Sequence, residues 1–315
     1  MKYFTKDWYV LMQHLNYTAG MTPIADKKYT DGEITALLSG KIKERIERDM
    51  EEYNTPPVRT EIDFENFQPD DFATYDMERG VLVIPSAIEE IKADIERDYQ
   101  NRLAEFENRP PFDPKKTIEE FTETYKSELK YGYLRFPEWV KGAADIRLIA
   151  MGYLPESVYK DLEAEQQRNK QLFEAINDSA TATLNAENEK IPEEIARNFS
   201  FHDGEIIYLE EADGDIVMLI NEDYIPYEGQ TPYTKVIFVG AKIIERDENL
   251  KFERENIEID GQNCPTYPVW LYEELYKTKD GYEAHMLLSE NDLCYLTIAC
   301  RDIKFEFNID YREHE

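Results

Sequence analysis

The periodicity of apolar residues changes along this chain from a helical repeat to strict alternation, and this change limits the folds that it can adopt. In the front half, apolar side chains recur every four residues, as at Ile34, Leu38, Ile42, Ile46 and Met50. Such a repeat places them on one stripe of a helix. Near the end, apolar residues alternate with polar ones at Ile303, Phe305, Phe307 and Ile309. The sequence therefore predicts an α+β fold, with an α-helical N-terminal region followed by a predominantly antiparallel β domain with a covering helix.

Capping signals divide the front half into helices. A capping box at Thr30 and Glu33 predicts a helix that runs to about Tyr53, before two prolines. A second helix is expected to open at residues 86–89 and to end before Pro110, and the two amphipathic helices should pack as a pair. Three further starts are indicated by Thr117 with Glu120, by Pro137 and by Pro155.

The back third has the sequence pattern of β-hairpins, in which short apolar runs are separated by turn residues. Residues 206–210 and 216–221 flank Asp213-Gly214, a pair that favours a two-residue hairpin turn. A longer strand is predicted over 234–244, and another hairpin over 284–288 and 293–299. We interpret residues 270–276 as a helix that covers the sheet.

A length of 315 residues is about twice the ~150 that serve as a prior for one domain, so two units are expected. The composition becomes rich in Ser, Thr, Ala, Asn and Glu over residues 177–190, and a short turn is expected at 192–194. We therefore predict an α-helical domain over 1–190 and an antiparallel α+β domain over 196–315.

The chain is strongly acidic, with 67 acidic and 36 basic residues and a formal net charge of −31. Residues 197–315 hold 27 acidic and 11 basic side chains, a net charge of −16. A field of this sign repels phosphate backbones and anionic lipid, which argues against nucleic acid and membrane surfaces as partners. It favours a basic protein partner, or serves solubility alone.

Other sequence features indicate a cytoplasmic location. Residues 1–9 lack the apolar segment and small-residue cleavage site of a secretory signal, and no run of 18 apolar residues exists. The cysteines at 264, 294 and 300 form no C-x-x-C pair and leave one unpaired in any disulfide scheme. Free, buried thiols in a reducing compartment are expected.

Few residues have the spacing of a chemical site. His202-Asp203 resembles the paired metal ligands of helical phosphohydrolases, and His285 is the one further histidine near it in the back third before the terminal His314. We expect His202 to fix the entry into the first strand. Asp213-Gly214-Asp215 resembles the start of a calcium loop, but Val217 stands where a ligand is needed, which favours a turn.

No phosphate-binding loop, dinucleotide fingerprint or nucleophile elbow occurs, and no metal or cofactor is predicted. The acidic residues of the first long helix, such as Glu47, Asp49, Glu51 and Glu52, alternate with basic ones and are interpreted as a solvated face. The three tryptophans, Trp8, Trp139 and Trp270, are expected in the core rather than at a ligand.

Three short motifs carry a family resemblance: M-K-Y-F-T-K-D-W-Y at residues 1–9, F-H-D-G at 201–204 and W-L-Y-E-E at 270–274. With these motifs the chain resembles bacterial proteins of the family called domain of unknown function 4085. The resemblance implies a bacterial, cytoplasmic protein and brings no activity with it. The back third is also similar to small bacterial proteins, some of them immunity proteins of polymorphic toxins.

These observations favour a non-enzymatic, acidic interaction protein, in an immunity-like role, that binds a basic protein. The alternative is a metal-dependent hydrolase that uses His202, Asp203 and His285. Clustering of these three side chains around a polar pocket would favour the enzyme, whereas separated or packed side chains would favour the binding protein. The sequence does not predict an oligomeric state.

Overall fold

A computed structural model of the chain describes residues 1–62, 73–76, 81–85, 87–222, 226, 229–252, 255–259, 262–290 and 292–311, with backbone alone at 74, 76, 255–259 and 262–265. Contacts between Cα atoms divide the chain into two compact units. Unit 1 consists of Met1–Met12, Ala73–Ile84 and Phe173–Glu315, and unit 2 consists of Gln13–Phe72 and Pro85–Leu172. The sequence predicted that residues 1–190 and 196–315 form separate domains that fold independently. This division stays a prediction.

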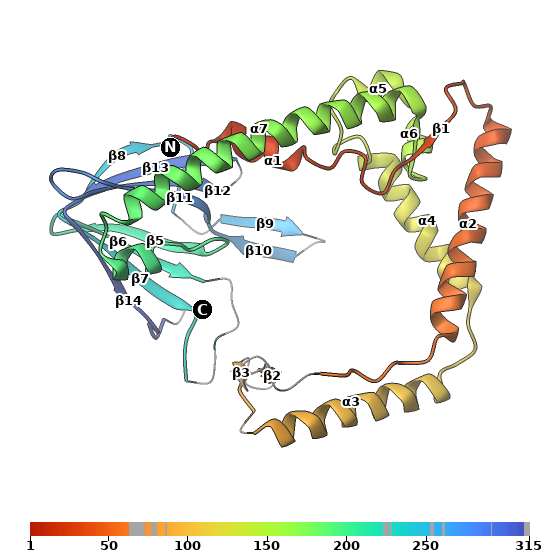
Figure 1. The fold of residues 1–315 in the computed structure, drawn as a ribbon, viewed down its shortest axis with the longest axis horizontal. Helices are drawn as coiled ribbons and strands as arrows, with labels where there is room; N and C mark the ends of the chain where they lie inside the picture. Colours follow the sequence, from red (N-terminus) through yellow and green to blue (C-terminus); the bar gives the residue numbers. More distant parts are fainter. Residues whose placement is uncertain are drawn as a thin grey trace. The chain divides into compact units, whose positions relative to one another are not determined.

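Unit 2 is built from helices, with one short parallel strand pair between β1 (Thr22–Ile24) and β4 (Tyr153–Pro155). Its helices, shown in Figure 1, are α2 (Asp31–Asn54), α3 (Ile88–Asn108), α4 (Pro114–Tyr131), α5 (Val140–Ala143), α6 (Ile146–Ile149) and the first half of α7 (Glu156–Asn188). The apolar core of the unit gathers around the fully buried Val140, Leu154 and Leu162.

The predicted capping box at the start of α2 is confirmed. The backbone N–H of Glu33 donates to the Thr30 hydroxyl at 3.3 Å, and the Thr30 N–H donates to the Glu33 carboxylate at 2.8 Å. Helix α4 begins earlier than predicted, because Asp113 caps it and Pro114 occupies its first turn. The helix that packs against α2 is α4 rather than the predicted partner α3.

Helix α7 is continuous through residues 177–188, where the sequence predicted a boundary segment. Glu193–Asn198 form a short helix, α8, in place of the expected turn. Its Ile195 and the following Phe199 are buried in the core of unit 1. Helix α1 (Lys6–Gln13) lies at the other end of the chain, and its Trp8 is also buried.

Unit 1 is organised around an eight-stranded sheet with the order β14-β7-β6-β5-β11-β12-β13-β8, in which every neighbouring pair is antiparallel. The strands are β5 (Glu205–Ala212), β6 (Asp215–Asn221), β7 (Tyr233–Val239), β8 (Lys242–Arg246), β11 (Val269–Lys277), β12 (Tyr282–Ser289), β13 (Leu293–Cys300) and β14 (Asp302–Glu306). Two separate hairpins join β2 (Thr74–Asp76) to β3 (Val81–Val83) and β9 (Glu255–Ile259) to β10 (Gln262–Thr266). The predicted α+β class is confirmed.

The sheet consists of two four-stranded halves that meet at β5 and β11, where Glu205 pairs with Val269. Apolar side chains from one face of both halves form one core with α8, and it includes Met218, Phe238, Trp270, Met286 and Leu296. Because residues from both halves share this core, the sheet folds over on itself (Figure 1).

The hairpin predictions for 206–221 and 284–299 are confirmed by β5–β6 and β12–β13. Asp213 and Gly214 both have positive φ, 52° and 85°, as a type I′ turn requires. The predicted strand over 234–244 is divided into β7 and β8 at Gly240, where φ is 57°. Residues 270–276 are strand β11, so their prediction as a helix is wrong.

The tryptophan and cysteine predictions are confirmed in part. Trp8 and Trp270 are buried, whereas Trp139 is 39% exposed. Cys294 and Cys300 are free and buried, and Cys264 lies outside the described side chains. Across the described part of the chain, no helix combines the length and apolar character needed to span a membrane.

Candidate functional site

Strand β11 presents different chemistry on its two faces. Successive residues of a strand point to opposite sides, and an irregularity between Trp270 and Tyr272 resets this alternation at Leu271. Trp270 and Leu275 therefore lie in the core of the folded sheet. Tyr272, Glu274 and Tyr276 share the opposite face.

On that opposite face, Glu274 binds the N-terminal segment of the chain. Its Oε1 accepts the backbone N–H groups of Tyr3 and Phe4 at 2.7 and 2.8 Å. Its Oε2 accepts the N–H of Lys2 and the hydroxyl of Tyr276, both at 2.7 Å. These four bonds fill the acceptor capacity of a carboxylate, and the Glu274 side chain is only 1% exposed.

The ionisation of Glu274 follows from these bonds. Burial alone raises the pKa of a carboxyl group, but the donors from Lys2, Tyr276, Phe4 and Tyr3 outweigh it, and the pKa of Glu274 lies below its usual value. Burial and the bond to this carboxylate raise the pKa of Tyr276. Glu274 is therefore a charged anchor in a protein interior.

Aromatic side chains complete this face. Tyr272 contacts Phe4, Trp8 and Tyr9, with ring centroids 5.6, 4.8 and 6.3 Å apart. Trp8 stacks on Phe173 of α7 at 5.6 Å, and its indole N–H donates to Asn177 at 2.9 Å. The opening motif is thus bound to β11 and to the part of α7 that belongs to unit 1.

On the core face, β11 meets the F-H-D-G motif. The N–H of Asp203 donates to the carbonyl oxygen of Trp270 at 2.7 Å. The N–H of Trp270 donates to the carbonyl oxygen of Gly204 at 2.8 Å. The Trp270 ring lies 5.4 Å from both Phe199 and Phe201. All three sequence motifs of the family resemblance therefore converge on one strand.

Glu273 is the polar residue of this core face. Its Oε2 accepts the indole N–H of Trp270 at 2.8 Å, and the Ser200 hydroxyl is a second donor. Burial raises the pKa of Glu273, against the opposing effects of these two donors and of the nearby His202. The carboxyl group lines a cavity of about 140 Å³ between α7, α8 and β11.

The structure places the predicted candidates His202, Asp203 and His285 at two different positions. His202 and Asp203 are half-exposed neighbours whose Nδ1 and Oδ2 atoms lie 3.0 Å apart. The His202 ring contacts Tyr272, whereas the His285 ring contacts Tyr276 four residues further along β11. Four residues of strand span roughly 13 Å, so the two histidines do not share a pocket.

Both ring nitrogens of His285 contact neighbouring side chains. Its Nδ1 lies 3.3 Å from the Thr297 hydroxyl and its Nε2 lies 3.4 Å from Glu283. Burial lowers its pKa. Among the residues that the structure describes, no three His, Cys, Asp or Glu side chains are grouped so that they could hold a metal ion. His314 lies outside the described residues.

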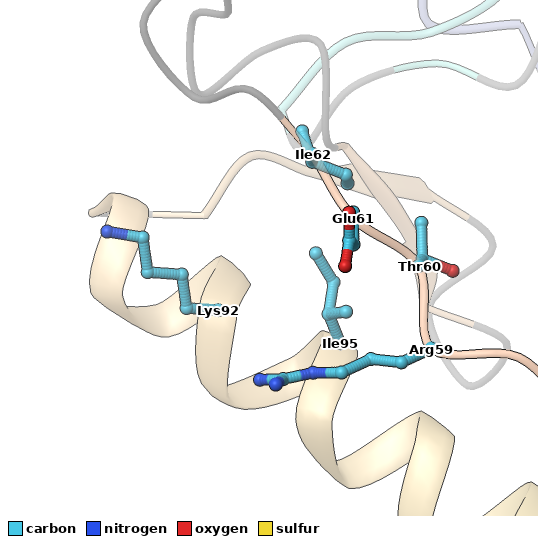
Figure 2. A pocket seen from close by; sticks show the side chains of 6 residues that line it. All are labelled: Arg59, Thr60, Glu61, Ile62, Lys92 and Ile95. Atoms are coloured by element: carbon cyan, nitrogen blue, oxygen red, sulfur yellow. The ribbon is translucent and has the colours of Figure 1, made fainter.

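Other cavities lie in unit 2 and are open to solvent. One of about 340 Å³ is shown in Figure 2, where Lys92 and Ile95 project from α3 beside the extended residues 59–62. The Arg59 guanidinium at this pocket is paired with Glu96 at 2.8 Å. Two others, of about 390 and 420 Å³, share Lys27 and Tyr29 in their walls.

Glu273 and Glu274 were missed as site residues by reasoning from the sequence. A usable signal was present, because W-L-Y-E-E-L-Y places two adjacent acids inside an aromatic and apolar run. In a strand buried on both faces, adjacent acids must both be buried, and buried carboxyl groups require partners. In a helix, two adjacent acids need not both be buried, so the predicted helix did not indicate that Glu273 and Glu274 have partners.

Residues 96–299 match the model of a family described as Protein of unknown function (DUF4085). The match covers β11 and the F-H-D-G motif, and it begins after the N-terminal segment that Glu274 binds. No curated protein and no solved structure matches the chain.

Proposed function

We propose that this chain, which belongs to the DUF4085 family, is a non-enzymatic interaction protein that binds a basic protein partner through unit 1. The observation that carries the proposal is the uneven distribution of charge between the units. Unit 1 contains 36 acidic and 15 basic residues, a net charge of −21, whereas unit 2 contains 31 and 21, a net charge of −10. Unit 1 therefore carries about two thirds of the net charge.

The two units also differ in how their acids are paired. In unit 2, acidic and basic side chains pair along helix surfaces at i, i+3 or i, i+4, as Arg45 does with Asp49 and Lys160 with Glu156. At the tip of the β5–β6 hairpin, Glu210, Glu211 and Asp213 are exposed and have no ion-pair partner among the described residues. Uncompensated, exposed carboxylates at the tip of a hairpin attract a basic surface and accelerate encounter with it.

The test is the salt dependence of binding to a partner captured from the source cell. The association rate should fall steeply between about 50 and 500 mM salt, as the Debye length shrinks from roughly 14 to 4 Å. A triple variant, Glu210→Gln, Glu211→Gln and Asp213→Asn, should slow association several-fold. The matched control, Glu47→Gln, Glu51→Gln and Glu52→Gln in α2, removes the same charge from unit 2 and should slow it less.

Association that is indifferent to salt, or partners that are themselves acidic, would contradict the proposal and leave solubility as the role of the charge. Equal effects of the two triple variants would contradict the assignment to unit 1. An immunity-like role is one form of this proposal and would require the captured partner to be a toxin.

The second candidate function is a metal-dependent hydrolase that uses His202, Asp203 and His285. The exposed His202–Asp203 pair at 3.0 Å is the observation that favours it. The separate contacts of His202 and His285 with Tyr272 and Tyr276 count against it. Hydrolysis lost in His202→Ala at an unchanged melting temperature would support the enzyme and contradict a purely binding role.

A further inference from the structure

The cavity beside Glu273 is lined by both apolar and polar side chains and contains one carboxyl group. Its lining comes from three elements of unit 1: Leu184 and Asn188 of α7, Ala196 of α8, the adjoining Phe199 and Ser200, and Glu273 and Leu275 of β11. Ser200 is exposed, whereas Phe199 and Leu275 are buried. The cavity therefore leads from the surface at Ser200 toward the apolar interior at Phe199 and Leu275.

The Glu273 carboxyl group has acceptor capacity left. A carboxylate offers about four acceptor sites, and Glu274 next to it uses all four. Glu273 is bonded by two donors, the Trp270 indole and the Ser200 hydroxyl. Its remaining acceptor sites are available to a group that enters the cavity which it lines.

We propose that this cavity binds an aliphatic ammonium group, and that it receives a lysine side chain of the basic partner. Leu184, Ala196 and Leu275 provide apolar contacts for the methylene stem of lysine, and the carboxyl group matches the terminal ammonium with its three donors. The part of this inference that concerns a protein rests on the proposed function. The part that concerns the ammonium group stands on the cavity alone.

The small cavity favours the narrower of the two basic side chains. Its volume of about 140 Å³ exceeds the roughly 10–15 Å³ that one water-sized group requires, so it can hold a short linear chain. Butylammonium, the lysine side chain, has five heavy atoms in a line, whereas the planar guanidinium of arginine is wider and longer.

Trp270 supplies a direct readout. Its indole N–H is bonded to Glu273, and the chain has three tryptophans, so three indole signals are expected in a ¹H–¹⁵N spectrum of the full-length protein. Addition of n-butylammonium chloride at pH 7 should shift the Trp270 signal in a saturable way. The signals of Trp8 and Trp139, whose partners are Asn177 and Glu165, should stay in place.

Two variants test the charge of Glu273 and the shape of the cavity separately. Glu273→Gln should weaken the binding of n-butylammonium at least about tenfold. Ala196→Leu keeps the carboxyl group, fills the cavity and should weaken binding equally. Glu248→Gln, an exposed acid elsewhere in unit 1, is the matched control and should leave the titration unchanged.

An absent shift, an equal shift with n-butanol, or an equal shift with potassium chloride at the same concentration would overturn the proposal. Binding of n-butylammonium together with loss of partner binding in Ala196→Leu would confirm both parts. If n-butylammonium binds but partner association is unchanged in Ala196→Leu, the cavity takes ammonium groups and its role in partner binding is wrong. A salt-dependent partner without n-butylammonium binding leaves the proposed function intact and overturns this inference.

Discussion

Glu273 and Glu274 are consecutive residues of β11 whose carboxyl groups lie on opposite faces of the sheet and have pKa values shifted in opposite directions. Both are removed from solvent to a large degree, so burial opposes the charged form of each. The difference is the number of donors. Four donors surround Glu274, and three of them are backbone N–H groups, whereas two side-chain donors reach Glu273.

Glu274→Gln should destabilise unit 1 by about 2–4 kcal/mol. Glutamine offers one acceptor oxygen and turns an NH2 group toward N–H donors, so the amides of Lys2, Tyr3 and Phe4 cannot all be satisfied. Chemical denaturation at pH 7 would measure the change in the free energy of unfolding. Glu283→Gln, at a partly exposed neighbour on β12, is the control and should change it by less than about 0.5 kcal/mol.

The stabilising effect of Glu274 should depend on pH. Its folded pKa lies below the unfolded value of 4.5, so its contribution is present above pH 4.5 and is lost as the pH falls through the folded pKa. The difference in stability between the wild type and Glu274→Gln should therefore shrink as the pH is lowered from 5 toward 3. A constant difference over this range would mean that the charge of Glu274 does not matter.

The contribution of Glu273 to stability should change with pH in the opposite direction to that of Glu274, and Glu273→Gln tests this. A folded pKa above 4.5 means that the folded state holds its proton more tightly, so wild-type stability falls as the pH rises from 4.5 through the folded pKa. Glutamine remains neutral and can still accept from Trp270. We expect the variant to lack this fall and to differ from the wild type by less than about 1 kcal/mol at pH 4. Urea titrations at pH 4, 6 and 8 would measure both.

Much of the fold followed from local sequence signals. The capping box at Thr30 and the positive-φ turn at Asp213-Gly214 are determined by residues close together in sequence, and both were predicted at the correct positions. The alternation at the end of the chain predicted β14. These features depend on backbone geometry that a few residues determine.

The candidate site depends on contacts between residues far apart in sequence, and these contacts were not predicted. Glu274 and Tyr3 are separated by 271 positions, and Trp8 and Asn177 by 169. No local pattern encodes such pairs, although the adjacent acids in an aromatic run indicate that partners must exist. The helix predicted over 270–276 shows how one wrong local assignment can hide a buried site.

The two described thiols should be inert in the folded protein. Burial raises the pKa of Cys300 to about 12 and also raises that of Cys294, so neither is a thiolate near neutral pH. In a Cys264→Ser background, Ellman's reagent at pH 8 should label neither thiol until denaturant is added, after which two thiols per chain should react. Rapid labelling of one thiol before unfolding would contradict the burial of that side chain.

Glycine substitutions should have opposite signs at two positions. Gly281 has φ of 150°, and an added Cβ would lie 2.0 Å from the carbonyl oxygen of Cys300, so Gly281→Ala should destabilise the protein by about 2–4 kcal/mol. Gly40 lies within α2, where an added Cβ meets nothing within 4 Å. Gly40→Ala should stabilise by about 0.5–1 kcal/mol. Thermal denaturation of both variants would test this, and two changes of the same sign would contradict it.

The N-terminal segment should bind to unit 1 as a separable peptide. Its attachment is provided by the three amides on Glu274, by the Trp8 indole on Asn177, and by a salt bridge of 2.6 Å between Lys6 and Asp247. A chain that lacks residues 1–12 would expose Tyr272 and leave the Glu274 carboxylate short of three donors. We expect this truncated chain to lose about 3–5 kcal/mol of stability.

Added as a synthetic peptide, residues 1–12 should restore part of that stability in a concentration-dependent way, because a ligand of the folded state stabilises by mass action. The same peptide with Trp8→Ala should restore less, since it loses the contacts with Tyr272 and Phe173. Truncated Glu274→Gln should respond weakly to either peptide. If all peptides raise the melting temperature equally, or none does, the segment is not held by the Glu274 anchor and the aromatic contacts described above.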